Sequence, residues 1–288
     1  MTENDFNWKN KKEVLRLERY PAGTNEELFL FTFPLLSKDT GVKNVFTTRQ
    51  GGISKGMFES LNLSYTRGDD PAAVTENYRR VASAMGGTLS DIVCSDQTHT
   101  TNVLRVDRSC GGYGVTRERP YTDVDGLVTN DPGVILATFY ADCVPLYFID
   151  PKNHAIGLSH SGWRGTVGRM GRATLEKMKE EFGTDPKDVL AAIGPSICQD
   201  CYEVSEDVAS AFATEFAGHE TEILIDKGNG KYQLDLWRSN AIVMQEAGIK
   251  KEHLAVTNLC TCCNPKLLFS HRASHGKRGN LGAFLKIM

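Results

Sequence analysis

The stretch VILATFYADCVPLYFIDPKNHAIGLSHSGWRG, residues 134–165, decides the fold of this chain. Its apolar runs are bounded by turn residues and predict three short buried strands, at 134–139, 146–149 and 155–159. A helix is expected to follow from about Gly165 to Phe182. Cys143 and His160 stand near the ends of two apolar runs, and a strand end holds a reactive side chain on a rigid frame.

The rest of the chain mixes strands and helices. Further strands are expected at 28–36, which includes an adjoining turn, and at 42–48, 92–94, 126–129, 189–193, 254–257 and 282–287. Further helices are expected at 71–84 after an Asp70 cap with Pro71 at the first position, at 205–216, and from an Asp235 cap to 247. Because strands outnumber helices and do not alternate with them strictly, the pattern indicates an α+β fold of stacked layers and not a doubly wound parallel sheet.

Composition narrows the class of protein. The 288 residues, 40% of them hydrophobic and 24% charged, suffice for one large domain or two small ones. A net charge of -3 gives no reason to expect nucleic acid or an anionic membrane as partner. No run reaches the roughly 20 apolar residues of a membrane helix. Residues 1–12 are polar, lack the apolar stretch of a signal peptide, and are expected to form a frayed tail.

The expected state of the eight cysteines depends on the compartment in which the protein resides. A chain without a secretion signal is predicted to be cytoplasmic, where thiols stay reduced. We therefore expect the cysteines to be free thiols or metal ligands and not disulfides.

Three residues are candidate metal ligands. Gln97-Thr98-His99 follows the strand expected at 92–94, so His99 joins Cys143 and His160. Three such ligands with no obvious fourth describe a catalytic zinc site with an open position. Each residue alone has an ordinary explanation, since a loop histidine is usually a polar surface residue and a cysteine is often a small buried apolar one.

The turn Gly162-Trp163-Arg164-Gly165 precedes the helix expected at 165–182. Glycines let the backbone pass close to a ligand, and a helix start presents free N–H groups. With Arg164 beside it, the turn could hold a phosphate or a carboxylate. The alternative is that Trp163 and Arg164 form a stacked structural pair.

A series of motifs carries a resemblance to a known family. They are Phe46-Thr47-Thr48-Arg49-Gln50-Gly51-Gly52, Ser60-Leu61-Asn62-Leu63, Gln97-Thr98-His99, Asp123-Val124-Asp125-Gly126-Leu127, Ala141-Asp142-Cys143-Val144-Pro145, His160-Ser161-Gly162-Trp163-Arg164-Gly165, Gly194-Pro195-Ser196-Ile197, Cys201-Tyr202-Glu203-Val204, Cys260-Thr261 and Phe269-Ser270-His271-Arg272. Their order and content resemble the YfiH-like family, also called the laccase-domain or polyphenol oxidase family. The match runs from about Val42 to the C-terminus.

The resemblance implies a fold and an activity. It implies a single-domain α/β/β/α sandwich resembling cysteine-hydrolase toxin domains, with residues 1–20 as a polar N-terminal tail and lead-in and residues 21–288 as the catalytic domain. It implies a zinc-dependent purine nucleoside phosphorylase that acts on adenosine, inosine and methylthioadenosine and also deaminates adenosine. Purine nucleosides and phosphate are then its partners. Bacterial members are also described as peptidoglycan editing factors and as copper-dependent polyphenol oxidases.

The resemblance also implies site residues. The family's metal triad falls on His99, Cys143 and His160. The catalytic residues are then Cys143, Asp142 and Arg49, and Arg49 or Arg164 could bind the substrate anion bidentately. Asp142 is either an acid/base group or a residue that hydrogen-bonds backbone at a turn.

One segment departs from the family pattern. The family usually shows Thr-Gly-Arg where this chain reads Gly276-Lys277-Arg278-Gly279-Asn280. If Gly279 takes the glycine position, Asn280 replaces the arginine, unless Arg278 reaches the same place.

Other functions fit the same residues. In a cysteine hydrolase, Cys143 would be the nucleophile, His160 its base and His99 an accessory group. In a copper oxidase, the histidines and the cysteine would hold copper.

A non-enzymatic alternative rests on other cysteines. Cys198-x-x-Cys201 with Cys260-x-Cys262-Cys263 could form a structural four-cysteine zinc site, although the second half departs from the usual two-residue spacing. The sequence does not fix the oligomeric state.

Overall fold

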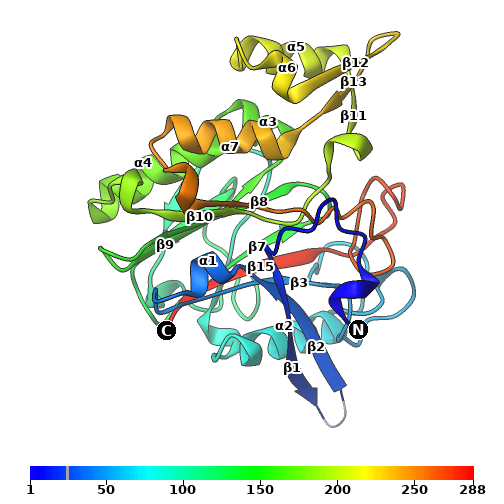
Figure 1. Ribbon diagram of the computed structural model, residues 1–288. Helices are drawn as coiled ribbons and strands as arrows, with labels where there is room; N and C mark the ends of the chain where they lie inside the picture. Colours follow the sequence, from blue (N-terminus) through cyan, green and yellow to red (C-terminus); the bar gives the residue numbers. More distant parts are fainter. Residues whose placement is uncertain (24–25) are drawn as a thin grey trace.

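Two stacked sheets form the centre of the molecule in a computed structural model that describes residues 1–23 and 26–288 (Figure 1). The first sheet has the order β1 (Arg16–Gly23), β2 (Glu26–Thr32), β3 (Val42–Thr47), β15 (Leu281–Ile287), β7 (Ile135–Tyr140) and β4 (Ile92–Cys94). The second has the order β14 (Leu254–Val256), β10 (Leu190–Ile193), β8 (Val144–Asp150), β9 (Ala155–Ser161), β6 (Gly126–Thr129) and β5 (Val103–Arg105). Most neighbouring strands run antiparallel; β4–β7, β5–β6 and β10–β14 are parallel.

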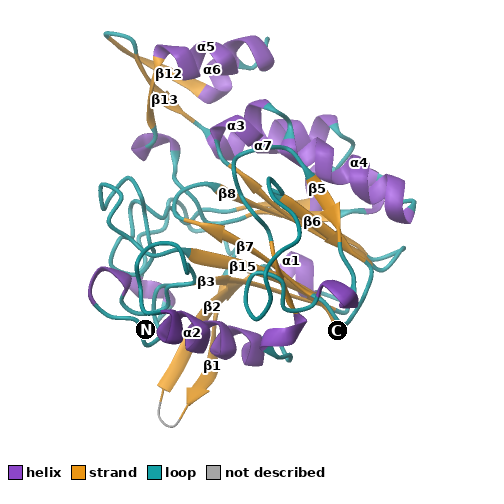
Figure 2. Ribbon diagram, turned by 180° about the vertical axis from the view of Figure 1, so that it is seen from behind, coloured by secondary structure: helices purple, strands orange, loops and turns teal. Residues whose placement is uncertain are grey.

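Helices cover the outer faces of both sheets, as Figures 1 and 2 show. The first sheet carries α2 (Pro71–Ala84), and the second carries α3 (Trp163–Val167), α4 (Met170–Phe182) and α7 (Leu236–Glu246). The short helix α1 (Pro34–Ser37) connects β2 to β3. A small sheet of β11 (Glu203–Ser205), β13 (Lys231–Leu234) and β12 (Leu224–Gly228) lies apart with α5 (Glu206–Glu215) and α6 (Glu220–Ile223). The 3-10 helices are Glu3–Asp5, Gly56–Phe58, Leu89–Asp91, Arg108–Cys110, Pro186–Asp188, Gln199–Cys201 and Lys251–His253.

Three apolar clusters hold the layers together. The central one lies between the two sheets and includes Phe46 and Leu136 from the first sheet and Tyr147 and Leu158 from the second. The other two lie between each sheet and its own helices. The expected α+β fold of stacked layers is confirmed, because the central strands of each sheet are buried between the other sheet and helices.

Local sequence signals explain where two long helices begin. The Asp70 side chain accepts a hydrogen bond from the Ala72 amide at 2.9 Å, and Pro71 occupies the first helical position of α2. Asp235 likewise accepts from the Arg238 amide at 2.9 Å and caps α7. Both predicted caps are confirmed.

Several expected elements differ. The strand predicted at 28–36 ends at Thr32, because Pro34 starts α1. The helix predicted at 165–182 is two helices, α3 and α4, separated at Arg169, whose φ of 62° is left-handed. The strands β1, β5, β11, β12 and β13 are short or rich in charged residues and are not among the predicted strands.

The expected frayed tail is wrong for residues 1–12. Phe6 is buried and packs edge-on against Phe31, with ring centroids 4.9 Å apart. Trp8 forms a β-bridge with Leu259. The few apolar residues in this polar segment therefore hold it against the body of the protein.

None of the helices in the described part of the chain has the length and apolarity that crossing a bilayer requires.

Candidate active site

The predicted triad comes together at one end of the second sheet. Cys143 lies in the turn between β7 and β8, immediately before Val144. His160 lies near the end of β9 and pairs in register with Pro145 of β8. His99 arrives on the loop after β4. Because β8 and β9 pair antiparallel, Cys143, which precedes β8, lies beside His160 near the end of β9.

The triad has the dimensions of a metal site. The Cys143 Sγ and His99 Nε2 atoms are 4.0 Å apart, and the ligand atoms of all three residues lie within 4.8 Å of one another. In a tetrahedral zinc site, bonds of about 2.3 Å to sulfur and 2.0 Å to nitrogen set neighbouring ligand atoms roughly 3.5 Å apart. Small side-chain movements would close the difference. His160 is buried, Cys143 is half-buried and His99 is exposed, so the group is open on one side.

Asp125 organises two members of the triad. Its Oδ1 accepts a hydrogen bond from His160 Nδ1 at 2.7 Å, which leaves Nε2 of that ring free to bind a metal. The same carboxylate accepts the backbone N–H groups of Thr98, His99 and Thr100 at 2.9–3.1 Å. These bonds hold His99 in a left-handed conformation with φ of 70°. Asp125 precedes β6, which pairs with β9, so the sheet itself sets this arrangement.

The triad is electrostatically prepared for a thiolate. Burial by itself raises the pKa of the Cys143 thiol, but His160 and His99 outweigh it and lower that pKa to about 6. Burial lowers the pKa of His160, whereas Cys143 and Asp125 raise it, to about 9. Without a metal, Cys143 and His160 therefore form a thiolate–imidazolium pair at neutral pH.

Gly162 leaves the space that the triad needs. A Cβ atom on this residue would lie 2.9 Å from His99 Cδ2 and 3.1 Å from Cys143 Sγ. Any side chain there would displace the candidate ligands. The close backbone approach inferred from the glycine in this turn is thus found at Gly162.

The triad opens into a cavity of about 320 Å³. Its walls include Tyr65 and Phe139 together with the cationic groups Arg67 and Arg278. The ring of Tyr65 stacks on Tyr78 with centroids 5.5 Å apart. A second hollow of about 530 Å³ shares Tyr65 and other lining residues with the first. The cavity therefore offers an aromatic wall, positive charge and three metal-binding side chains.

Arg278 has unused hydrogen-bonding capacity in this cavity. Its Nε is buried and has no hydrogen-bond partner among the described residues. Its Nη1 donates to the Gly279 carbonyl at 3.3 Å and to Asn280 Oδ1. Burial and the neighbouring Arg67 lower the pKa of Arg278 to about 10, so it stays charged at neutral pH. Arg278 thus lines the same cavity as Asn280.

The other predicted site residues have contacts of a different kind. Arg49 donates from Nε to the Glu59 carbonyl at 2.7 Å and from Nη1 to the Pro265 carbonyl at 2.9 Å. Arg164 is exposed and lies 4.3 Å from the Trp163 ring centroid, which matches the stacked structural pair. Neither arginine is among the residues that line the cavity beside the triad.

Asp142 is fully engaged by other loops. Its Oδ1 accepts from the Thr261 hydroxyl at 2.7 Å, and its Oδ2 accepts from the Arg272 amide at 2.7 Å. Its φ of 93° is left-handed, and it directly precedes Cys143. These contacts favour the hydrogen-bonding alternative, in which Asp142 positions the Cys143 turn.

Asp125 and Arg67 lie at the site although sequence reasoning gave them no role, whereas Arg278 was considered only as a replacement for the arginine missing at Asn280. The motif Asp123-Val124-Asp125-Gly126 was noted without a role for either acid. A signal was present, since Asp125 directly precedes an apolar run and such an acid needs partners if it is buried. For Arg67, which lies in an exposed loop, the sequence carries no comparable signal.

Comparisons with known proteins agree with the resemblance. A sequence model of the family described as multi-copper polyphenol oxidoreductase laccase matches residues 43–288. The chain is 36% identical over 246 residues to the purine nucleoside phosphorylase YlmD of Bacillus subtilis (strain 168), covering 83% of this chain and 86% of the relative. It is 33% identical over 233 residues to an adenosine deaminase from an unknown prokaryotic organism, covering 81% and 88%.

The fold is also similar to a crystal structure. YlmD from Geobacillus stearothermophilus superposes with a TM-score of 0.85 at 33% identity, covering 96% of this chain and 99% of that one.

Proposed function

Because this chain belongs to the YfiH-like family of laccase-domain proteins, we propose that it is a zinc-dependent purine nucleoside phosphorylase that also deaminates adenosine. The proposed substrates are adenosine, inosine and methylthioadenosine with phosphate. The proposal rests mainly on one observation: the three candidate metal ligands line the same cavity as Arg67 and Arg278. Phosphorolysis needs a bound phosphate beside the anomeric carbon, and this cavity supplies positive charge next to a candidate metal site.

His99, Cys143 and His160 are the proposed zinc ligands. Two imidazoles and one thiolate are donors that zinc accepts, and Asp125 fixes the tautomer of His160 that zinc binding requires. When bound, zinc would supply a Lewis acid with one open coordination position. Copper is the alternative, but blue-copper sites add a weak axial ligand, typically methionine, and no methionine is among the described residues that line this cavity.

The protein's own groups have separate proposed tasks. Arg278, with its unpaired Nε, and Arg67 would hold the phosphate through charge-assisted hydrogen bonds. The rings of Tyr65 and Phe139 would contact the purine. In phosphorolysis the C1′–N bond breaks, an oxygen of hydrogen phosphate bonds C1′, and the leaving purine takes up the proton that the phosphate loses. Holding both reactants in one cavity lowers the entropic cost of that step.

We assign positioning roles to Asp142 and Arg49. Both oxygens of Asp142 already accept hydrogen bonds from Thr261 and Arg272. Arg49 connects the 59–60 loop to the 265–269 loop through two carbonyls. Neither residue is then required to exchange a proton with the substrate.

A phosphate titration with adenosine tests the proposal. Phosphate and water are expected to compete for one site, so rising phosphate should divert adenosine from inosine to adenine and ribose 1-phosphate. The measurement is the ratio of the two purine products, with Cys143→Ala protein, purified identically, as the control for contaminating enzymes. No adenine release at any phosphate concentration would contradict the phosphorylase; two independent rates would contradict a shared site.

One observation favours a second candidate, a cysteine hydrolase. Cys143, His160 and Asp125 form a thiolate–imidazolium–carboxylate series. The predicted likeness to cysteine-hydrolase toxin domains, and with it an action on peptidoglycan precursors, stays a prediction. Activity on a muropeptide that survives complete metal removal would favour the hydrolase, whereas activity that returns with added zinc would favour the phosphorylase.

A further inference from the structure

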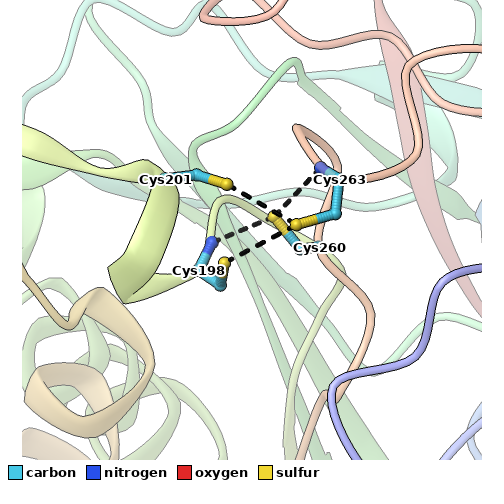
Figure 3. A group of neighbouring side chains, drawn as sticks. All are labelled: Cys198, Cys201, Cys260 and Cys263. Atoms are coloured by element: carbon cyan, nitrogen blue, oxygen red, sulfur yellow. Dashed lines mark hydrogen bonds between the residues drawn. The ribbon is translucent and has the colours of Figure 1, made fainter.

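Four cysteines outside the triad form a second group, which Figure 3 shows. They are Cys198, Cys201, Cys260 and Cys263, and their sulfur atoms all lie within 4.8 Å of one another. Cys201 Sγ is 3.5 Å and Cys198 Sγ is 4.0 Å from Cys263 Sγ. Cys198 and Cys260 are buried, and the other two are partly buried.

The sulfur separations suit a metal ion better than disulfides. A tetrahedral site with metal–sulfur bonds of about 2.3 Å sets its sulfur atoms roughly 3.8 Å apart. The observed 3.5 and 4.0 Å lie on either side of that value. A disulfide needs about 2.05 Å, and all four cysteines are free thiols here.

The structure resolves an irregularity in the sequence pattern. Because Cys262 lies outside the group, the second pair is Cys260-x-x-Cys263, with the same spacing as Cys198-x-x-Cys201. Two C-x-x-C pairs on separate loops are the usual arrangement of a structural zinc site. The apparent departure from two-residue spacing came from counting Cys262 as a ligand.

Backbone amides also point at the sulfur of Cys260. The amides of Cys198 and Cys263 donate to its Sγ at 3.3 and 3.4 Å. Hydrogen bonds of this kind stabilise a thiolate that binds a metal and orient it. Both cysteine-containing loops thus donate a backbone hydrogen bond to the Cys260 sulfur.

We propose that Cys198, Cys201, Cys260 and Cys263 bind a second, structural metal ion, preferably zinc. Four thiolates complete a tetrahedral ion and leave no open position, so this site holds loops together and performs no chemistry. The inference does not depend on the proposed function, because it uses none of the triad or cavity residues.

The proposed site would stabilise the turn that carries Cys143. Ile197, next to Cys198, donates its amide to the Asp142 carbonyl at 3.0 Å. Thr261, next to Cys260, donates its hydroxyl to the Asp142 carboxylate. Residues that neighbour two proposed ligands therefore hold Asp142 in its left-handed conformation, directly before Cys143.

The site would also fix the N-terminal segment. The Asn7 amide donates to Asn264 Oδ1 at 2.7 Å, and the Lys9 amide donates to the Asn258 carbonyl at 2.9 Å. Lys9 Nζ pairs with Asp200 at 2.5 Å, between Cys198 and Cys201 in the sequence. Residues 7–9 thus contact both cysteine-containing loops.

Metal analysis of the intact chain, purified with a reductant, tests the proposal. We expect close to two zinc ions per wild-type chain, one per Cys198→Ser chain and one per Cys143→Ala chain. The matched control is Cys262→Ser, which changes a neighbouring cysteine outside the group and should keep two. Cys198→Ser should also lower the melting temperature by about 10 °C, because metal binding contributes directly to folding.

The wild-type count together with the Cys143→Ala count is decisive even if Cys198→Ser fails to fold. Iron in place of zinc, recognised by its visible absorption, would still support a metal site at these thiolates. A count of one that Cys143→Ala reduces to zero, with all four cysteines alkylated freely in the folded wild type, would overturn the proposal. Disulfide bonds among these four cysteines that persist in wild-type protein purified with a reductant, found by peptide mass mapping, would also overturn it.

Discussion

The two cysteine-containing groups of this molecule differ in how many donors they offer and in what surrounds them. The triad of His99, Cys143 and His160 has three donors, one of them exposed, beside a cavity lined by three arginines. The four-cysteine group has four thiols between packed loops. Donor number and access, and not the mere presence of cysteine, separate a site suited to chemistry from one suited to holding loops.

Removal of the triad thiolate should produce the largest effect. Cys143→Ala deletes one of three proposed ligands and should lower phosphorolysis by more than about 100-fold, beyond the loss usual for residues behind a metal ligand. Circular dichroism should stay unchanged, since Cys143 lies in a turn and is half-buried. Full turnover in metal-free wild-type protein would contradict a catalytic metal at the triad, and with it the proposed difference from the four-cysteine group.

Loss of the carboxylate behind His160 should have the next effect. Asp125→Asn keeps the shape but weakens the bond to His160 Nδ1, so zinc affinity should fall about 10–100-fold. Competition with a chelator of known affinity measures this directly. The control is Asp123→Asn, two residues away in the same loop, which should change affinity by no more than about twofold. Equal effects of both variants would mean that Asp125 merely shapes the loop.

Thiol alkylation should distinguish Cys143 from an ordinary buried cysteine. The pKa of Cys143 is lowered to about 6, so in metal-free protein its thiolate dominates about tenfold at pH 7 and its reactivity is lost as pH falls below 6. Burial raises the pKa of Cys94 to about 12, and that residue should stay inert. Peptide mapping after iodoacetamide treatment at several pH values reads each cysteine separately. An alkylation midpoint near 9 for Cys143 would contradict the proposed charge pair, and protection by added zinc would sharpen its assignment to the triad.

The smallest expected effect concerns the phosphate. Arg278→Gln removes a positive charge from the cavity and should raise the KM for phosphate about fivefold. This factor corresponds to the loss of roughly 1 kcal/mol of charge-assisted hydrogen bonding. Arg49→Gln should leave that KM unchanged and lower thermal stability, because its donors bind two backbone carbonyls. The reverse pattern in steady-state kinetics would return Arg49 to the substrate-binding role that the resemblance implied.

The sequence predicted best those site residues whose positions depend on the ends of neighbouring strands. The triad could be named because its members end or follow apolar runs, and antiparallel pairing brings such ends together. Asp125 was given no role because an acid before an apolar run does not by itself show which groups hold it; here these are His160 and backbone amides of another loop. The anchoring of Phe6 and Trp8 was missed because isolated apolar residues in a polar segment show no period. The extra Cys262 obscured the second C-x-x-C pair.

The position of β15 has a consequence for how the protein is made. This strand, residues 281–287, lies in the first sheet between β3 and β7, which are complete by residue 140. During synthesis those two earlier strands have no partner on their facing edges until about 140 further residues have been added. Exposed edges of that kind are prone to pairing with other chains, so the nascent protein passes through a long aggregation-sensitive interval. Arg278 and Asn280 directly precede β15, and the same late step that closes the sheet therefore brings the last cavity residues to the triad.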